Sequence, residues 1–205
     1  MTVKIYGLTA SRALRNLWML EELRVPYSLV ETDFRTGATR TPEYLRLNPN
    51  ARIPALEDGD TVLFESMAIN LYLALKHGGP LWPKDPDGQG RVLQWTLWAV
   101  NELEHPLVDI LLHRMFLPEP ERNATLVRQA LDTLPTPFRI LDGELQNRLY
   151  LLSEGFTLGD LNVAIVMNYA RMAGIDLTPY PHLASWLDRC LSRPALKAAQ
   201  GLHAA

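Results

Sequence analysis

Hydrophobic and polar residues show two different periodicities along the first third of the chain. Residues 3–6 alternate apolar and polar side chains, as a half-buried strand does, and Gly7 ends that run. Residues 11–24 instead repeat their apolar side chains at helical spacing, and a second strand pattern covers residues 27–30 after Pro26. This order predicts a strand–helix–strand unit whose two strands pair in parallel.

The same third of the chain continues with a helix, a hairpin and another helix. A short helix is predicted from Thr41-Pro42-Glu43, because threonine caps helices and proline suits their first turn. Two short strands, residues 54–57 and 62–64, flank the hairpin-turn sequence Asp58-Gly59-Asp60. The second helix is expected over residues 66–76. With the first unit, these elements predict a mixed four-stranded sheet with helices packed on it.

A stretch rich in proline and glycine separates this part from a region with helical patterns alone. Residues 78–86 contain three prolines and two glycines, a composition typical of a domain boundary. Beyond it we expect helices at residues 87–116, 119–134, 136–149, 157–173, 180–192 and 194–200. The predicted organisation is an α/β domain over residues 1–77, a linker over residues 78–86 and an all-helical domain over residues 87–205.

The composition is that of a globular protein with a substantial core. Apolar residues make up 47% of the 205 residues and charged residues 21%, and the formal net charge is −3. This charge offers no basic surface, so we expect neither nucleic acid nor a membrane as a partner. The single cysteine, Cys190, excludes an internal disulfide and a cysteine-rich zinc site. Without a recognisable signal peptide or an apolar run of about 20 residues, a cytoplasmic location is expected.

Five segments of the chain carry short motifs: Ser11–Trp18, Asn48–Leu56, Glu65–Ile69, Phe156–Leu161 and Arg193–Ala195. In this order they resemble segments of the cytosolic glutathione S-transferase family. The first resembles the opening helix of serine-type bacterial and fungal members, and the second resembles the family's NPxGKVPxL stretch. The third resembles its ESxAI glutathione motif, the fourth the capping box of its C-terminal domain, and the fifth its usual ending. The chain departs from the family at Ala51, Arg52 and Gly159, where glycine, lysine and alanine are common.

The resemblance implies a fold, a reaction and an assembly. The fold is an α/β thioredoxin-like N-terminal domain with a mixed four-stranded sheet, followed by an all-α C-terminal domain. The reaction is conjugation of the glutathione thiolate to a small, apolar electrophile, a detoxification reaction, with glutathione-dependent peroxidase activity as a related reaction. Glutathione is then a co-substrate, no metal is expected, and the protein is expected to be a homodimer.

The resemblance also assigns residues to glutathione. Ile53-Pro54 is expected to have a cis peptide bond, which turns the Ile53 backbone outward to pair with the cysteinyl unit. Glu65 is expected to meet the ammonium group of the γ-glutamyl unit, and Ser66, at a helix N-terminus, its α-carboxylate. Arg52 is expected to hold the glycine carboxylate, because a guanidinium binds a carboxylate bidentately.

Ser11 is the candidate for activating the glutathione thiol. Its hydroxyl, close to a positive helix end, would donate a hydrogen bond to the thiolate and favour the ionised form. Judged by local sequence alone, Ser11 also sits where a helix N-cap belongs. Thr9, in the same loop, and Tyr6, in the preceding strand, are the alternatives for the hydroxyl that stabilises the thiolate.

Three residues of the long helix after the linker are candidates for contacting the electrophile: Asn101, His105 and Met115. The alternative interpretation is that they are ordinary core and surface positions. A second function is also open, because proteins with this fold serve as non-catalytic interaction modules accessory to transcription or translation. The complete set of glutathione-binding residues in this sequence favours the enzyme.

A capping box marks the start of a helix late in the chain. Thr157-Leu158-Gly159-Asp160 has the required spacing, and Phe156 and Leu161 form its hydrophobic staple. Because such a box satisfies the free backbone groups of a helix end, we expect it to serve folding rather than chemistry.

Overall fold

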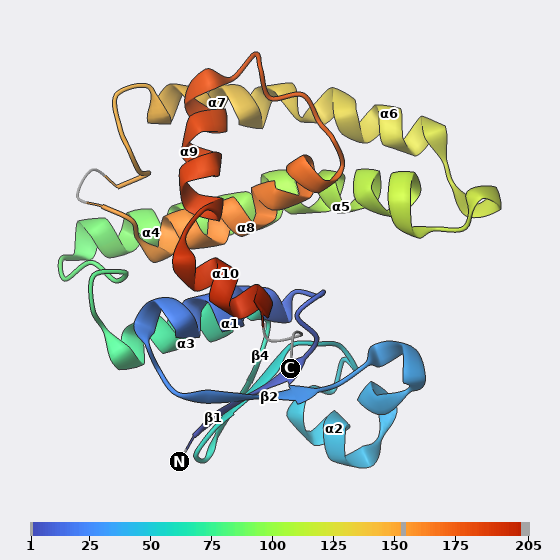
Figure 1. The fold of residues 1–205 in the computed structure, drawn as a ribbon, viewed down its shortest axis with the longest axis vertical. Coiled ribbons are helices and arrows are strands. Elements are labelled where there is room, and N and C mark those ends of the chain that lie inside the picture. Colours follow the sequence, from blue (N-terminus) through green and yellow to red (C-terminus); the bar gives the residue numbers. More distant parts are fainter. Residues whose placement is uncertain (1, 153–154, 202–205) are drawn as a thin grey trace. The chain divides into compact units, whose positions relative to one another are not determined.

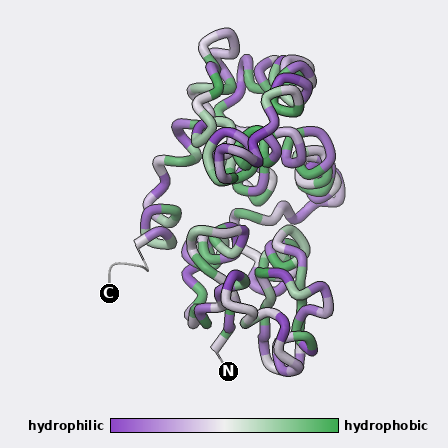
Figure 2. Tube along the Cα trace, turned by 90° about the vertical axis from the view of Figure 1, so that its right-hand side faces the viewer, coloured by the Kyte–Doolittle hydropathy of each residue, from purple (hydrophilic) through white to green (hydrophobic). Residues whose placement is uncertain are grey.

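The computed structural model describes residues 2–152 and 155–201, and the chain divides into two compact units. One unit contains the chain up to Gly79 together with the segment that starts at Ser192, and the other spans Pro80–Leu191. Figure 1 shows the course of the chain through both units, and Figure 2 shows that hydrophobic residues recur along the described parts of both. None of the described helices is both long and apolar enough to cross a bilayer.

A mixed four-stranded sheet forms the centre of the first unit. Its strands are β1 (Val3–Gly7), β2 (Tyr27–Glu31), β3 (Ala55–Asp58) and β4 (Thr61–Phe64). They lie in the order β2-β1-β3-β4; β1 and β2 are parallel, and the β1–β3 and β3–β4 pairs are antiparallel. The predicted sheet, with one parallel pair and a hairpin at its edge, is therefore confirmed.

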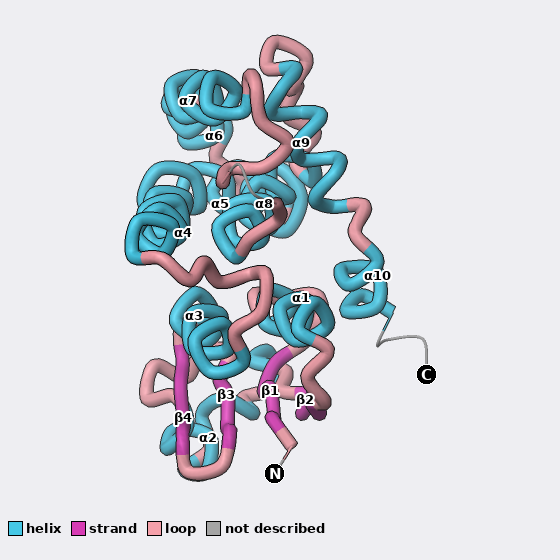
Figure 3. The backbone as a smooth tube through the Cα atoms, turned by 90° about the vertical axis from the view of Figure 1, so that its left-hand side faces the viewer, coloured by secondary structure: helices cyan, strands magenta, loops and turns pink. Residues whose placement is uncertain are grey.

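Helices cover this sheet. The helices α1 (Ala13–Leu23) and α3 (Ser66–His77) pack against each other beside the strands (Figure 3). Two short turns, η1 (Phe34–Thr36) and η2 (Ala38–Arg40), lead into α2 (Pro42–Leu47). Side chains of β1 alternate between the faces of the sheet: Ile5 is fully buried, and Tyr6 meets the ring of Tyr44 of α2 edge-on.

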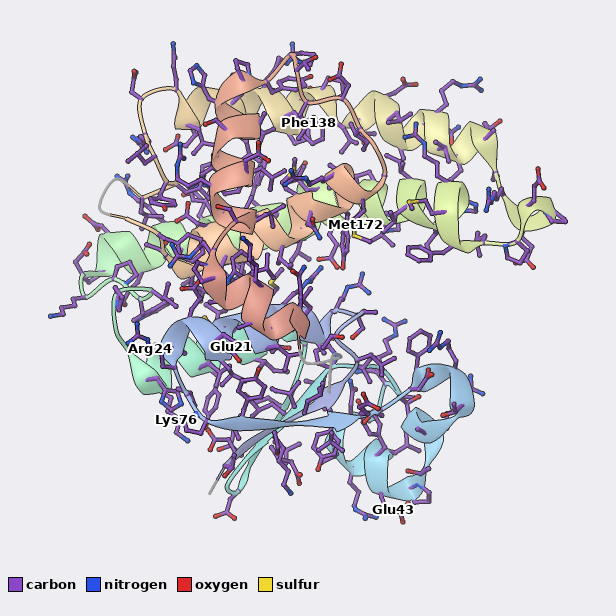
Figure 4. All side chains as sticks on the ribbon, viewed as in Figure 1. Glu21, Arg24, Glu43, Lys76, Phe138 and Met172 are labelled. Atoms are coloured by element: carbon purple, nitrogen blue, oxygen red, sulfur yellow. The ribbon has the colours of Figure 1, made fainter. Side chains whose placement is uncertain are left out.

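The second unit is helical in the part of the chain that the structure describes. Its α-helices are α4 (Pro86–Trp98), α5 (His105–Leu111), α6 (Ala124–Thr133), α7 (Pro135–Leu145), α8 (Leu158–Met172) and α9 (Pro181–Leu191). The π-helical turns η3 (Ala99–Glu104) and η4 (Leu112–Phe116) continue α4 and α5, and the short turn η5 (Glu119–Glu121) follows. The helix expected at residues 87–116 is therefore one continuous helical stretch with two widened turns. The core of this unit includes Phe138 of α7, labelled in Figure 4, whose ring packs edge-on against Tyr180.

The last helix, α10 (Pro194–Gly201), lies with the first unit rather than with the helical unit. It packs against α1, with Leu196 and Ala199 buried. Arg193 joins the two elements through an ion pair with Glu22 of α1, at N–O distances of 2.5 and 2.7 Å. The expectation of a helical domain extending over residues 87–205 was therefore wrong for this segment, because helical periodicity shows that a helix packs but not against which neighbour.

Candidate functional site

The strand register brings three loops together at one end of the sheet. Tyr6 of β1 is paired with Ala55 of β3, and Ala55 is paired in turn with Phe64 of β4. The loop that follows β1, the loop that precedes β3 and the loop that follows β4 therefore meet at the same end. These loops carry the residues predicted to activate glutathione and to bind its peptide: Ser11, Arg52, Ile53, Pro54, Glu65 and Ser66.

Gly7 allows the first of these loops to pack closely on α1. A side-chain carbon at position 7 would lie 2.6 Å from Ala13 Cβ, which is too close for any residue except glycine. The same point lies 3.8 Å from Ser11 Oγ and 3.7 Å from Ile53 Cβ. Ser11 and Ile53 are therefore neighbours across the end of β1, as one bound peptide would require.

The hydroxyl of Ser11 is bonded within its own loop. It donates to the carbonyl of Leu8 at 2.6 Å, and its oxygen accepts from the N–H of Ala13 at 3.1 Å. The helix α1 begins at Ala13 with Arg12 as its N-cap. Ser11 is therefore not the N-cap, although its oxygen satisfies an N–H group of the first turn that has no acceptor within the helix.

The two alternative hydroxyls have different surroundings. Tyr6 donates to the carboxylate of Glu57, and burial together with that hydrogen bond raises the pKa of Tyr6 to about 12. A phenol whose proton is already donated to a carboxylate is a poor donor to a thiolate. Thr9 is 5% exposed, and its Oγ1 has no hydrogen-bond partner within the described residues. Thr9 is therefore the stronger alternative to Ser11.

The loop before β3 carries the Ile53-Pro54 pair, and its peptide bond is cis, as predicted. The carbonyl oxygen of Arg52 accepts hydrogen bonds from Tyr44 Oη at 2.7 Å and from Asn48 Nδ2 at 2.8 Å. These bonds fix the backbone just before the pair. The side chain of Arg52 is exposed, so its guanidinium is accessible to a carboxylate.

Ala51, at the turn before Arg52, has a left-handed backbone conformation with φ of 54°. Glycine adopts this region without a steric penalty, whereas a residue with a Cβ atom pays roughly 1–2 kcal/mol there. The resemblance to a family in which glycine is common at this position therefore has a physical basis. The chain keeps the turn despite the substitution.

Glu65 and Ser66 form the junction between β4 and α3. Glu65 is exposed and has φ of 70°, a value that residues other than glycine rarely adopt and that often marks a functional position. Ser66 is 5% exposed and is the first residue of α3, whose opening N–H groups have no acceptor within the helix. The junction thus offers a carboxylate to an ammonium group and a helix N-terminus to a carboxylate.

Two polar residues of α1 that sequence reasoning missed reach Ser66. Arg15 and Asn16 are 2% and 0% exposed. Arg15 Nη1 donates to Ser66 Oγ at 3.2 Å, and Asn16 Nδ2 donates to the Ser66 carbonyl at 2.8 Å. The signal that could have identified them is a polar pair inserted directly before Leu17 and Trp18, in the apolar pattern of the helix.

The residues predicted to contact the electrophile lie in the helical unit, on one helical stretch. Asn101 is in η3, His105 begins α5 and Met115 is in η4, and all three are exposed. His105 Nε2 lies 3.7 Å from Asp109 Oδ2. Within the described ranges, no three His, Cys, Asp or Glu side chains group as metal ligands would. The role of these residues toward an electrophile stays a prediction.

Two protein-family models match the chain. Residues 1–75 match "Glutathione S-transferase, N-terminal domain", and residues 105–194 match "Glutathione S-transferase, C-terminal domain". The first match includes every loop at the end of the sheet described above.

Relatives match over most of their length. Glutathione S-transferase GstB of Escherichia coli (strain K12) is 30% identical over 184 residues, which is 88% of each chain. Glutathione S-transferase 3 of Zea mays is 33% identical over 208 residues, 95% of this chain and 91% of the relative. The solved theta class glutathione S-transferase from Xanthomonas axonopodis pv. citri, with glutathione bound, is 30% identical with a TM-score of 0.88, covering 97% and 96% of the two chains.

Proposed function

Because the chain belongs to the glutathione S-transferase family, we propose that it is a serine-type glutathione transferase acting on an electrophilic, apolar compound. The observation that carries this proposal is the meeting of three loops, with Ser11, Ile53 and Ser66, at one end of the sheet. In the reaction the thiol proton passes to solvent, sulfur bonds to the electrophilic carbon, and the leaving group departs with its electron pair. The same thiolate can reduce a hydroperoxide to an alcohol and water, with a second glutathione completing the disulfide.

The proposed binding mode uses both ends of the peptide. The γ-glutamyl ammonium pairs with Glu65, and its α-carboxylate meets Ser66 and the first turn of α3. The Ile53 backbone pairs with the cysteinyl unit as a neighbouring strand would, and Arg52 holds the glycine carboxylate. This arrangement leaves the thiol beside the loop that carries Ser11.

The direct test is retention on immobilised glutathione, followed by turnover of glutathione with 1-chloro-2,4-dinitrobenzene, a general aryl halide. An enzyme is retained, eluted by free glutathione and active. The alternative, a non-catalytic interaction module, predicts a folded protein without turnover. Retention without turnover of either the aryl halide or cumene hydroperoxide would therefore contradict the proposed activity.

Glu65→Gln is expected to raise the Kd for glutathione about fivefold. The substitution removes the charge that faces the ammonium group, and an exposed ion pair contributes up to about 1 kcal/mol. Isothermal titration calorimetry measures the change. Glu43→Gln, at an exposed glutamate of α2 labelled in Figure 4, is the matched control and should leave the Kd unchanged. Equal affinities for the wild type and Glu65→Gln would remove Glu65 from the site.

The electrophile is proposed to contact Asn101, His105 and Met115 of the helical unit. Met115 is 51% exposed, and the neighbouring Leu112 and Phe116 are 38% and 61% exposed. Large apolar side chains exposed together are typical of surfaces that bind apolar molecules. Such a surface selects by apolarity rather than by particular hydrogen bonds, as a detoxification enzyme of the cytoplasm would require.

A homodimer is proposed for the assembly. Both units expose large apolar side chains, and those of the helical stretch formed by α4 and η3 recur on one helical face. They are Val62, Phe64 and Leu75 in the first unit, and Leu93, Leu97 and Val100 in the second. Two-fold pairs are the commonest way to cover such surfaces. Light scattering at micromolar concentration should give twice the 23.2 kDa mass of the chain, and a mass of one chain would refute the dimer.

A further inference from the structure

Arg15 is a charged residue in a place where charges are rare. It lies on α1, is 2% exposed, and is among the largest fully buried side chains of the protein. A guanidinium keeps its charge throughout the pH range in which proteins fold, so the charge itself is buried. Burial of a charge is costly, and arginine is almost never fully buried unless its charge has a partner or a task.

The contact between Arg15 and Ser66 orients the serine hydroxyl. Arg15 Nη1 donates to Ser66 Oγ at 3.2 Å. A guanidinium only donates, so the hydrogen of the Ser66 hydroxyl must point away from Arg15. An oxygen that accepts from a cation is also polarised, which makes its own hydrogen a better donor. Ser66 is thereby prepared to donate to an anion on its other side.

Asn16 fixes the backbone of the same residue. Its Nδ2 donates to the Ser66 carbonyl at 2.8 Å and to Asn70 Oδ1 at 2.7 Å. Asn16 and Asn70 are both 0% exposed, so these bonds are shielded from water. The first turn of α3 is therefore held against α1 at the residue whose hydroxyl Arg15 orients.

We propose that Arg15 is a positioning residue for the γ-glutamyl end of the thiol substrate. Acting through the Ser66 hydroxyl, its buried charge makes the site select thiols that carry a free α-carboxylate at that end. Glu65, the exposed residue directly before Ser66, selects the ammonium group of the same unit. This inference rests on the proposed function and deepens it, because it names the residue that gives the subsite its positive charge.

The test is a double-mutant cycle in which a change in the protein is combined with a change in the thiol substrate. The two thiols are glutathione and its decarboxylated analogue, 4-aminobutanoyl-cysteinylglycine, which keeps the ammonium group but lacks the α-carboxylate. KM and kcat are measured for both with the same aryl halide. Arg15→Gln should raise the KM for glutathione about 10- to 100-fold and change kcat little. The loss in affinity is of the size that follows when one partner of a charge pair shielded from water is removed. For the analogue the KM should change less than twofold.

Two further variants separate positioning from folding. Arg15→Lys keeps the charge and should recover part of the preference for glutathione. If Arg15→Gln does not fold, the comparison of the two thiols is made with Arg15→Lys. Leu17→Ala removes a fully buried side chain of the same helix and should affect both thiols alike. Equal changes in KM for both thiols in the Arg15 variants, or no change in either, would overturn the inference. A wild type that turns over neither thiol would instead overturn the proposed function.

Discussion

Asp160→Ala is expected to lower the free energy of unfolding of the helical unit by about 3–5 kcal/mol. Asp160 is 0% exposed and lies in the first turn of α8. Its Oδ1 accepts hydrogen bonds from Leu151 N at 2.8 Å and from Trp186 Nε1 at 3.0 Å. Its Oδ2 accepts from Thr157 N at 2.9 Å and from Thr157 Oγ1 at 3.0 Å. Alanine leaves all four donors buried without an acceptor; one such loss costs about 1–3 kcal/mol, and losses within one hydrogen-bond network do not add in full.

Asparagine at position 160 is not expected to restore the stability of the wild type. Burial raises the pKa of Asp160, and only the four donated hydrogen bonds favour its charged form. Every partner is a donor, so the amide group of asparagine would place its own N–H hydrogens against one of the two pairs. We therefore expect Asp160→Asn to lose about half as much stability as Asp160→Ala, instead of behaving as a conservative change.

Urea unfolding followed by circular dichroism and by tryptophan fluorescence measures both losses. Asp176→Ala is the matched control, because Asp176 also accepts from the N–H and the hydroxyl of a threonine, Thr178, but is exposed. It should cost about 1 kcal/mol or less. If Asp160→Ala cost no more than Asp176→Ala, the capping box would not be a main support of the helical unit.

The strands and the hairpin of the first unit could be predicted because their sequence signals are local. Asp58-Gly59-Asp60 predicted a hairpin, and the structure ends β3 at Asp58, starts β4 at Thr61 and gives Gly59 a φ of 63°. Only a residue without a Cβ atom adopts that value freely. The capping box at Thr157 and Asp160 was predicted correctly for the same reason, since its partners are three residues apart.

Contacts between distant segments could not be predicted in this way. The periodicity of residues 194–200 indicated a helix but gave no sign that Arg193 would pair with Glu22, far back on α1. The short turns η1 and η2 were missed, because runs of three residues leave no periodic signal. The first error concerns the segment against which a helix packs. The second concerns turns that are too short to show hydrophobic periodicity.

In the candidate site, too, contacts between distant segments could not be predicted from local sequence. The cis bond at Ile53-Pro54 followed from the resemblance, since local sequence favours a trans bond. Arg15 and Asn16 were missed because their partner, Ser66, lies about 50 residues away on another helix. The role of Ser11 toward the thiol stays a prediction, and its hydrogen bond to the Leu8 carbonyl could not be predicted because it depends on the exact turn of the loop.

Ser11→Ala is expected to raise the pKa of the glutathione thiol in the complex by about one unit. A hydrogen bond to a charged group contributes about 1.5–3 kcal/mol, and giving up the bond to the Leu8 carbonyl offsets about 0.5–1.5 kcal/mol of it. The remainder corresponds to about one unit, at about 1.36 kcal/mol per unit. Because the hydroxyl favours the ionised thiol, its removal lowers the thiolate fraction at pH 7, and kcat should fall about five- to tenfold.

The pH dependence of kcat for both proteins measures this effect. Above about pH 9 the thiol is largely ionised in either protein, so the two rates should converge there. Thermal unfolding controls for the stability lost with the Ala13 N–H bond, about 0.5–1.5 kcal/mol. Thr9→Val is the rival variant, because Thr9 Oγ1 is buried without a partner among the described residues. A profile displaced by Thr9→Val and unmoved by Ser11→Ala would transfer the role to Thr9.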